Sequence, residues 1–206
     1  MIHYREYVSY DDYVEQQGEK IRRGAIVSNQ MLKFISRFKR YYTHHMLPGR
    51  VLCLGARTGD EVRAMMRCGF KDSVGLDLYP LGANVIKGDW HNLPFEVGSF
   101  ENVYTNSLDH CLDFNKMMLE VRRVLVPWGV FIFETWIHYA LDSRLKGDDI
   151  DIEAVRTGEI DRHPFNAMFW DSISDVVDAV IANGFQLAHS FVEEPKWCGY
   201  ILQRVS

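Results

Sequence analysis

Gly55 and Gly59 stand between two patterned runs of the chain, and glycines in this position favour an anionic ligand. Residues 51–54 are continuously apolar, as in a strand buried on both faces, and a helix-period run follows Gly59. A glycine-bearing turn between a buried strand and a helix N-terminus lets a ligand approach the backbone, and the helix dipole attracts its anionic part. We therefore expect a nucleotide-like ligand here. A tight turn without a ligand is the alternative.

An acidic residue strengthens this expectation. Asp77 closes the next apolar run, residues 74–77, about 20 residues beyond Gly55. A carboxylate in this place can accept hydrogen bonds from both hydroxyl groups of a ribose. The glycine turn and the acid together therefore predict a ribose-containing ligand better than the glycines do alone.

A proton acceptor follows a later strand. Within Ser107-Leu108-Asp109-His110, the imidazole of His110 has an unperturbed pKa near 6.5 and can accept a proton at neutral pH. Asp109 and His138 are the next candidates for a general base. The alternative for His110 is a structural histidine whose hydrogen bonds are satisfied within the fold.

The elements that must hold these residues form an alternating pattern from about residue 50. β-branched runs alternate with helix-period runs, which predicts an α/β sheet with helices on its faces. Helices are expected at residues 113–125, capped by Asp113, and at residues 172–183, where Ser172 and Asp175 have capping-box spacing. The last two strands have no helix between them and predict an antiparallel hairpin at the sheet edge. The expected strands are residues 51–54, 74–77, 84–87, 100–105, 130–135, 185–192 and 200–205.

Two segments lie outside this alternation. Residues 1–48 carry a tyrosine series followed by apolar positions, which suggests helices packed across one end of the sheet. The tyrosines are interpreted as a face through which a helix packs on the protein. The alternative is that they form part of a substrate-binding site. Residues 137–169 are too long for an ordinary connection and are expected to form a loop or lid with some local helix. The acidic residues within them read as a solvated loop.

Four sequence segments in this order resemble the class I S-adenosylmethionine-dependent methyltransferases, in particular the methyltransferase type 11 group. The resemblance covers residues 49–135 well and the rest weakly. It implies a Rossmann-like α/β fold: a seven-stranded, mostly parallel sheet with an antiparallel C-terminal hairpin, helices on both faces and an N-terminal helical cap. Residues 1–48 would be that cap, and residues 49–206 the methyltransferase domain. The four segments are VLCLGARTGDEV, VGLDLYP, GDWHNLPFEVGSFENVYTNSLDH and MMLEVRRVLVPWGVFIFET.

The resemblance also implies roles for single residues toward S-adenosyl-L-methionine. The turn amides would meet the carboxylate of its methionine part, Asp77 would hold the ribose, and Asp89 would accept a hydrogen bond from the adenine amine. The structural alternative for Asp89 is that it caps the following turn. The alternative for Trp90 is that it is a core residue. The implied cofactor-binding residues are Gly55, Ala56, Arg57, Gly59, Asp77, Leu78, Asp89, Trp90, Asn106 and Ser107.

The sequence departs from the family pattern in three places. Cys53 stands where the family usually has an acidic residue, and Arg57 stands where it has a glycine. Arg57 could pair with the cofactor carboxylate or narrow the pocket. The link between Asp77 and Asn84 is shorter than a parallel crossover normally needs, so the family's second helix is expected to shrink to a turn.

These features together predict methyl transfer from S-adenosylmethionine to a small-molecule acceptor. A non-catalytic module that binds the cofactor is one alternative. A dinucleotide-dependent oxidoreductase is a weaker one, because Gly55-Ala56-Arg57-Thr58-Gly59 does not match G-x-G-x-x-G. The sequence determines neither the acceptor, nor the oligomeric state, nor whether oxygen, nitrogen or carbon is methylated.

Composition limits the remaining possibilities. The 206 residues are 47% hydrophobic and 25% charged, which fits one folded domain. No apolar run of about 18 residues occurs, so we expect a cytoplasmic protein without a membrane span. The four cysteines lack zinc-ligand spacing and read as buried or free thiols, and His44-His45 lacks a third ligand, so no metal is expected.

Charge is unevenly distributed along the chain. The net charge of -5 disfavours binding of nucleic acid, whose affinity comes mostly from neutralised phosphates. Yet no acidic residue occurs from Lys20 to Arg50. If this stretch covers the acceptor site, an anionic small substrate is favoured. A solvated helix face is the alternative. Its basic residues are Lys20, Arg22, Arg23, Lys33, Arg37, Lys39, Arg40 and Arg50.

Overall fold

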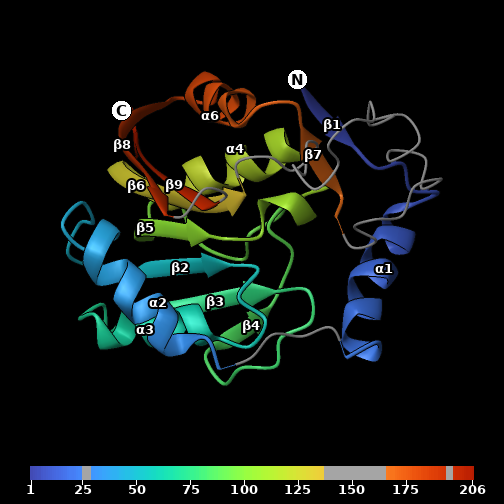
Figure 1. Ribbon diagram of the computed structural model, residues 1–206, viewed down its shortest axis with the longest axis horizontal. Helices are drawn as coiled ribbons and strands as arrows, with labels where there is room; N and C mark the ends of the chain where they lie inside the picture. The colour runs from blue at the N-terminus through green and yellow to red at the C-terminus, as the bar shows by residue number, and fades with distance from the viewer. Residues whose placement is uncertain (25–28, 137–165, 194–196) are drawn as a thin grey trace.

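The computed structural model describes residues 1–24, 29–136, 166–193 and 197–206. Its centre is a seven-stranded sheet of order β4-β3-β2-β5-β6-β9-β8 (Figure 1). The five strands from β4 to β6 run parallel, whereas β9 is antiparallel to β6 and to the edge strand β8. The mostly parallel sheet with a C-terminal hairpin is thus confirmed. The strands are β2 (Val51–Leu54), β3 (Ser73–Asp77), β4 (Val85–Lys87), β5 (Phe100–Thr105), β6 (Leu125–Trp136), β8 (Phe185–Glu193) and β9 (Trp197–Arg204).

Strand β2 lies at the centre because all four of its residues are apolar and buried. Its side chains alternate between the two faces, as the pleat requires. Leu52 and Leu54 belong to one hydrophobic cluster, and Val51 and Cys53 to the other. A continuous apolar run therefore supports helices on both sides of the sheet.

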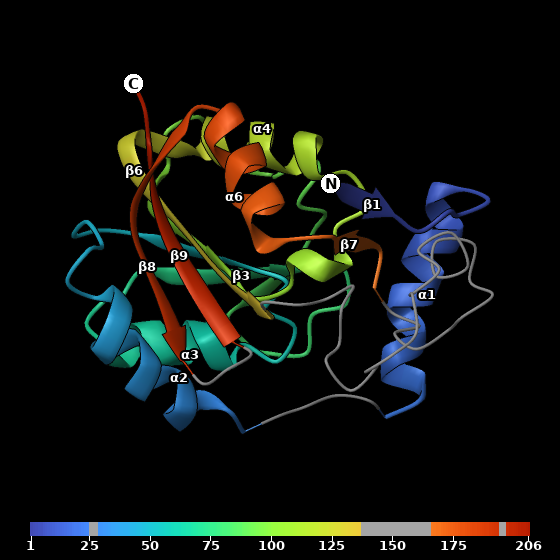
Figure 2. The same ribbon diagram turned by 45° about the horizontal axis from the view of Figure 1, so that its top comes forward.

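Helices cover both faces (Figure 2). α4 (Phe114–Val124) and α6 (Ile173–Ala182) pack on the face of Leu52 and Leu54. α3 (Asp60–Arg67), α2 (Met31–Arg37) and the π-helical segment η1 (Phe38–Tyr42) pack on the other.

Side-chain caps confirm two predicted helix starts. The Asp113 side chain accepts a hydrogen bond from the amide of Lys116 at the start of α4. Ser172 and Asp175 form the predicted capping box at the start of α6. After α4 no separate turn follows: β6 already begins at Leu125, and residues 127–129 form an irregularity within it, where Trp128 has a φ of 65°.

The link between β3 and β4 contains no helix, as predicted. Its residues instead lie against the turn that follows β2. The amides of Leu81 and Gly82 both donate to the carbonyl oxygen of Arg57, over 2.7 and 3.0 Å. A Cβ added to Gly82 would lie 2.5 Å from the carbonyl oxygen of Thr58, so only glycine fits this close approach. The short link therefore supports the glycine turn directly.

The N-terminal segment has three separate placements. β1 (Ile2–Tyr4) pairs with β7 (Met168–Trp170), a two-stranded sheet that the sequence pattern did not predict. α1 (Tyr10–Arg22) stands beyond the end of the main sheet (Figure 1), whereas α2 and η1 lie on its face. The tyrosine series is therefore not one helix face, because Tyr4 lies in β1 and Tyr7 precedes α1.

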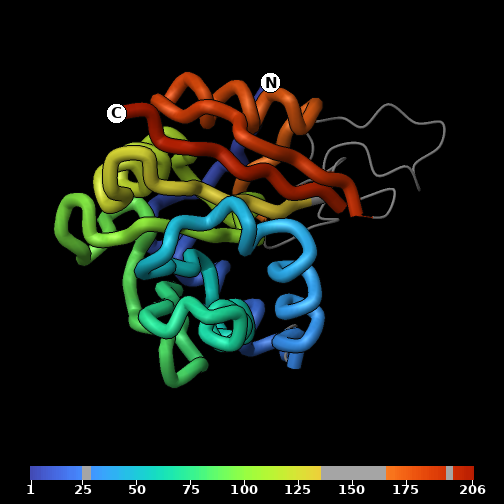
Figure 3. Tube along the Cα trace, turned by 90° about the vertical axis from the view of Figure 1, so that its left-hand side faces the viewer, coloured from blue at the N-terminus to red at the C-terminus, as the bar shows by residue number. Residues whose placement is uncertain are grey.

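The last two strands close the other side of the molecule. Figure 3 shows β8 and β9 running side by side, and their register joins Phe185 to Arg204 and Glu193 to Trp197. Most of the predicted segment 137–169, including His138 and the acidic loop residues, lies outside the described residues.

Candidate functional site

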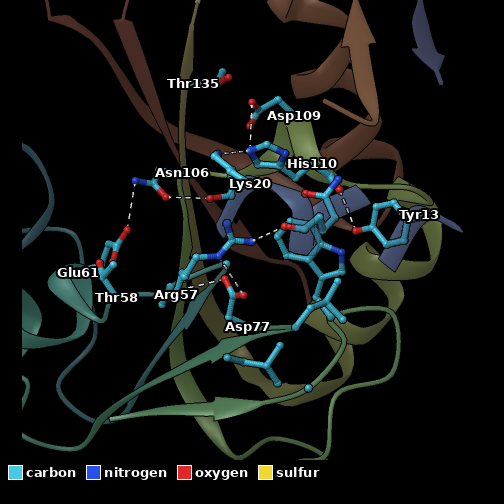
Figure 4. A pocket seen from close by; sticks show the side chains of 18 of the residues that line it. Tyr13, Lys20, Arg57, Thr58, Glu61, Asp77, Asn106, Asp109, His110 and Thr135 are labelled. Carbon is cyan, nitrogen blue, oxygen red and sulfur yellow. Dashed lines mark hydrogen bonds and ion pairs between the residues drawn. The ribbon is translucent and has the colours of Figure 1, made fainter. Parts of the chain in front are cut away.

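A cavity of about 420 Å³ opens at the carboxyl ends of the central parallel strands. In open α/β sheets this edge is where ligands bind, and the volume is typical of small-molecule sites. Figure 4 shows side chains from the turn after β2, the end of β3, the loop after β5 and α1 around it. The predicted site residues that line it are Gly55, Ala56, Arg57, Asp77, Leu78, Trp90, Asn106, Ser107, Asp109 and His110.

The turn after β2 requires glycine at two positions for conformational and steric reasons. Gly55 has a φ of 71°, and a Cβ there would lie 2.8 Å from the Cβ of Ser107. Gly59 has a φ of 72° and precedes α3, but it does not line the cavity. Both residues therefore shape the turn through the left-handed conformation that side chains disfavour.

The amides of this turn are already used within the protein. Gly55 and Ala56 both donate to the carbonyl oxygen of Leu76, over 2.9 and 3.2 Å, and Arg57 donates to Oδ2 of Asp77 over 3.1 Å. In this arrangement the three N–H groups donate within the protein, and the expected contact with a ligand carboxylate is not part of it. A ligand carboxylate needs other donors.

Asp77 is held at the edge of the cavity by several hydrogen bonds. Its Oδ1 accepts from the amide of Tyr79 over 2.8 Å, and Nε of Arg57 lies 3.5 Å from the same oxygen. The guanidinium of Arg57 also reaches the carbonyl oxygen of Gln17 on α1, over 3.5 Å. Arg57 thus stands in the cavity beside Asp77 (Figure 4).

Asp89 turns its carboxylate to the protein and is not among the cavity's lining residues. It accepts from the amide of His91 over 2.9 Å, from Nδ1 of the same histidine over 2.7 Å, and from the hydroxyl of Tyr10 over 2.7 Å. Burial raises the pKa of Asp89, but these hydrogen bonds outweigh it and hold the pKa at about 2. The turn-capping role is therefore the one observed, while its neighbour Trp90 both lines the cavity and belongs to the hydrophobic core.

His110 lies in the short helix η2 (Leu108–His110), directly under α1. Its Nε2 is 3.2 Å from Nζ of Lys20 and 3.7 Å from Oδ2 of Asp109. The hydroxyl of Tyr13 donates to the His110 carbonyl oxygen over 2.9 Å. Burial lowers the pKa of Lys20. Residues of α1 thus contact the predicted base. Sequence periodicity could not predict this contact, because Lys20 and His110 lie 90 positions apart.

Glu61 is a site residue that the sequence reasoning missed. It lies in the first turn of α3, lines the main cavity, and is only 9% exposed. Its Oε1 accepts from Nδ2 of Asn106 over 3.4 Å, and Oε2 has no hydrogen-bond partner within the described part of the chain. Burial raises the pKa of Glu61 to about 7. An acidic residue in the first turn of a helix ordinarily interacts favourably with the helix dipole. The residue type therefore did not identify Glu61 as part of a binding site.

Most basic residues of the stretch from Lys20 to Arg50 do not line the main cavity. Of its eight basic residues, all of which the structure describes, Lys20 alone lines the main cavity. Arg37 is buried and forms ion pairs with Glu134 and Glu193, and Arg40 stacks on Tyr41. Arg37 is therefore held inside the fold by its two acidic partners and does not line the main cavity.

Comparisons with known proteins agree with this geometry. Residues 52–133 match the family model described as a methyltransferase domain. The match covers less than half of the chain and makes residues 52–133 similar to a methyltransferase domain. S-adenosylmethionine is the cofactor that this match with a methyltransferase domain implies for these residues.

Individual relatives are more distant. A sterol 24-C-methyltransferase of Gibberella zeae is 26% identical over 175 residues, which cover 75% of this chain and 45% of that protein. The chain thus spans just under half the length of this curated relative. No described helix of the chain is both long enough and apolar enough to cross a membrane.

Two solved structures share the fold. The 1,6-didemethyltoxoflavin-N1-methyltransferase of Burkholderia thailandensis, with 1,6-didemethyltoxoflavin and S-adenosylhomocysteine bound, has a TM-score of 0.68 at 13% identity, covering 98% of this chain and 92% of that one. An S-adenosylmethionine-dependent methyltransferase of Mesorhizobium loti has a TM-score of 0.56 at 18% identity, covering 77% and 93%. At these identities the likeness concerns the fold.

The residues of the methyltransferase domain fit its cofactor chemically. Asp77 presents carboxylate oxygens beside the cavity, as ribose hydroxyls require, and Trp90 offers an aromatic surface for a base. The buried, unpartnered Oε2 of Glu61 is suited to a positively charged or N–H-bearing group. The cavity therefore offers groups for both the nucleoside and the amino-acid part.

Proposed function

We propose that this protein transfers the methyl group of S-adenosylmethionine to a small-molecule acceptor. The single observation that carries the proposal is the cavity at the strand ends, which joins the glycine turn, Asp77 and the loop after β5. When bound, the cofactor supplies a methyl group that its sulfonium already activates. The protein's contribution is then mainly alignment of the acceptor, the methyl group and the leaving sulfur.

In this proposal the nucleoside part lies along the ends of β2 and β3. Asp77 accepts hydrogen bonds from the ribose hydroxyls, while Leu78 and Trp90 contact the adenine ring. Gly55 allows the chain to pass close to Ser107, and Asn106 lies beyond it at the end of β5. Asp89 acts indirectly here, because its hydrogen bonds to His91 and Tyr10 fix the loop that carries Trp90.

The acceptor occupies the side of the cavity under α1. The ammonium of Lys20 donates to Nε2 of His110, which holds this imidazole in its neutral, basic form. An anionic group of the acceptor draws Lys20 toward itself, and Nε2 of His110 then accepts the acceptor's proton. Asp109 lies 3.7 Å from the same nitrogen and stabilises the imidazolium that results.

The cofactor part of the proposal is tested by titration calorimetry with S-adenosylhomocysteine. Asp77→Asn should weaken binding at least tenfold, because a carboxylate that accepts hydrogen bonds contributes roughly 1.5–3 kcal/mol. Asp72→Asn, at an exposed carboxylate just before β3, is the matched control and should bind like the wild type. Absence of binding by the wild-type protein would overturn the proposal.

The acceptor part is tested by transfer of an isotope-labelled methyl group into a metabolite extract. His110→Ala should lower the rate and remove the limb of the pH profile that reports the imidazole, whereas Lys20→Met should mainly raise KM for an anionic acceptor. A protein that binds S-adenosylhomocysteine but labels nothing in extracts of different origin would be a binding module instead. An unchanged pH profile in His110→Ala would exclude this residue as the base.

A further inference from the structure

Glu61 marks the boundary between two cavities. Besides the main cavity, a second one of about 230 Å³ lies between α2 and the start of α3. Glu61, Thr58 and Asn106 line both, so the two spaces share a wall. In Figure 4 the Glu61 carboxylate points toward Asn106, away from Asp77. The carboxylate therefore stands at the end of the main cavity opposite the ribose position.

This carboxylate is poorly satisfied within the described part of the chain. Among the described residues, the one side chain that donates a hydrogen bond to it is Asn106, over a long distance, and Oε2 accepts none. Its neighbour Asp60, by contrast, pairs with Arg63 and accepts from the amide of Gln30. A buried carboxylate without a partner is costly, so such a group is kept where a ligand completes it.

We propose that Glu61 binds the α-ammonium group of the cofactor's amino-acid part. The inference rests on the proposed function and assigns a residue that the family's sequence pattern does not indicate. Of the two cationic centres of S-adenosylmethionine, the sulfonium has no N–H to donate, whereas the ammonium has three. The ammonium is therefore the group that satisfies Oε2, and Asn106 holds Oε1 in place for it.

The surroundings favour a zwitterion at this end of the cavity. Lys33 of α2 lines the second cavity together with Glu61, and it supplies a positive charge for the carboxylate of the amino-acid part. This placement is consistent with the turn after β2, whose amides of Gly55, Ala56 and Arg57 are already bonded within the protein. The ammonium of the cofactor's amino-acid part thus faces the carboxylate of Glu61, and its carboxylate faces the ammonium of Lys33.

The ligands for the test differ only in the amino-acid part. S-adenosylhomocysteine carries both the ammonium and the carboxylate, its decarboxylated analogue carries the ammonium alone, and 5′-methylthioadenosine carries neither. Calorimetry of Glu61→Gln should give a tenfold to hundredfold loss of affinity, roughly, for the first two ligands. Affinity for 5′-methylthioadenosine should stay within about twofold of the wild type, which also shows that the variant is folded.

Each other result has a definite meaning. Equal losses for all three ligands would reject the ammonium contact and leave Glu61 a purely structural group. Unchanged affinity for all three would reject any contact. Failure of the wild-type protein to bind any of them would instead overturn the proposed function, so the two failures are distinguishable.

A pH series gives a second readout. Because the free protein's Glu61 has a pKa of about 7, its carboxylate must lose a proton to bind the ammonium, and affinity for S-adenosylhomocysteine should fall as pH drops below 7. Glu61→Gln should remove this component, and 5′-methylthioadenosine should not show it. An identical pH dependence in both proteins would overturn the inference. Among the described residues, the other titratable or charged groups around Glu61 and its cavities are Asp60, Asp77, Cys53, Tyr13, Tyr104, Lys33, Arg37, Lys20, Arg57, Asp109 and His110.

Discussion

At the scale of single residues, Arg57 and Asp77 define the most unusual part of the site. Arg57 occupies a position where the family usually has glycine, and its side chain enters the cavity. Both the amide and the guanidinium of Arg57 approach the carboxylate that the ribose needs. The backbone contact orients Asp77 and is compatible with a bound ribose, but the side chain occupies space beside it. We therefore expect Arg57 to compete with a bound ribose through its side chain and not through its amide.

Replacing Arg57 should consequently strengthen cofactor binding. The contact of Nε with Asp77 is long, at 3.5 Å, so displacing it costs only about 0.5–1 kcal/mol. Arg57→Ala should raise the affinity for S-adenosylhomocysteine roughly twofold to fivefold, measured by calorimetry. Arg67→Ala, on the exposed last turn of α3, should leave it unchanged. Weaker binding by Arg57→Ala would mean that the guanidinium contacts the ligand instead.

At the scale of elements, α1 is the cover of the site. Three hydrogen bonds join α1 to three different loops at the sheet edge. The hydroxyl of Tyr10 donates to Asp89, the hydroxyl of Tyr13 donates to the carbonyl oxygen of His110, and the carbonyl oxygen of Val14 accepts from the hydroxyl of Tyr79. Each of these loops also carries residues of the cavity. α1 thus positions the loops and simultaneously contributes Lys20. Its placement over the strand ends makes it one wall of the cavity.

Gly18 is the close-contact point of α1. A Cβ there would lie 2.9 Å from Cζ of Tyr79. Gly18→Leu should push α1 off the loop, so hydrogen exchange of residues 10–22 should lose protection roughly tenfold while α4 keeps its protection. Glu15→Leu adds the same side chain at an exposed position of α1 and serves as control. Equal protection in both variants would show that α1 docks without Gly18.

At the scale of the whole molecule, one buried ion-pair cluster joins segments from both ends of the chain. Arg37 of α2 pairs with Glu134 of β6 and Glu193 of β8, and Nε1 of Trp197 donates to Glu134 over 3.0 Å. Burial raises the pKa of Glu134, while Arg37 lowers it. The cluster holds α2 against the sheet, and α2 in turn forms the wall of the second cavity.

Breaking this cluster should destabilise the fold. Arg37→Met leaves Glu134 buried without its cation and should cost about 3–5 kcal/mol, which denaturant unfolding measures. Arg40→Met removes an exposed charge from the same segment and should cost less than about 1 kcal/mol. The double variant Arg37→Met with Glu134→Leu should recover part of the loss. A double variant less stable than Arg37→Met would contradict the interpretation.

The sequence by itself determined the seven strands of the main sheet, the glycine turn, the caps of α4 and α6, and the acid at the end of β3. These features depend on local patterns: the apolar run before Gly55, the capping residues Asp113 and Ser172, and the position of Asp77 at the close of its own strand. Parallel strands bring their carboxyl ends to one edge, so the site's location followed as well. The departure at Arg57 was also visible without a structure.

Only the tertiary structure decided which groups face one another across that edge. Lys20 meets His110, Tyr10 ties down Asp89, and Arg37 turns inward to Glu134, although the partners lie 79 to 97 positions apart. Such contacts arise because packing decides which face of a helix is buried, and residue type does not encode it. The same holds for Glu61: α3 packs against β2 and β3, and this packing buries a carboxylate whose Oε2 has no partner among the described residues.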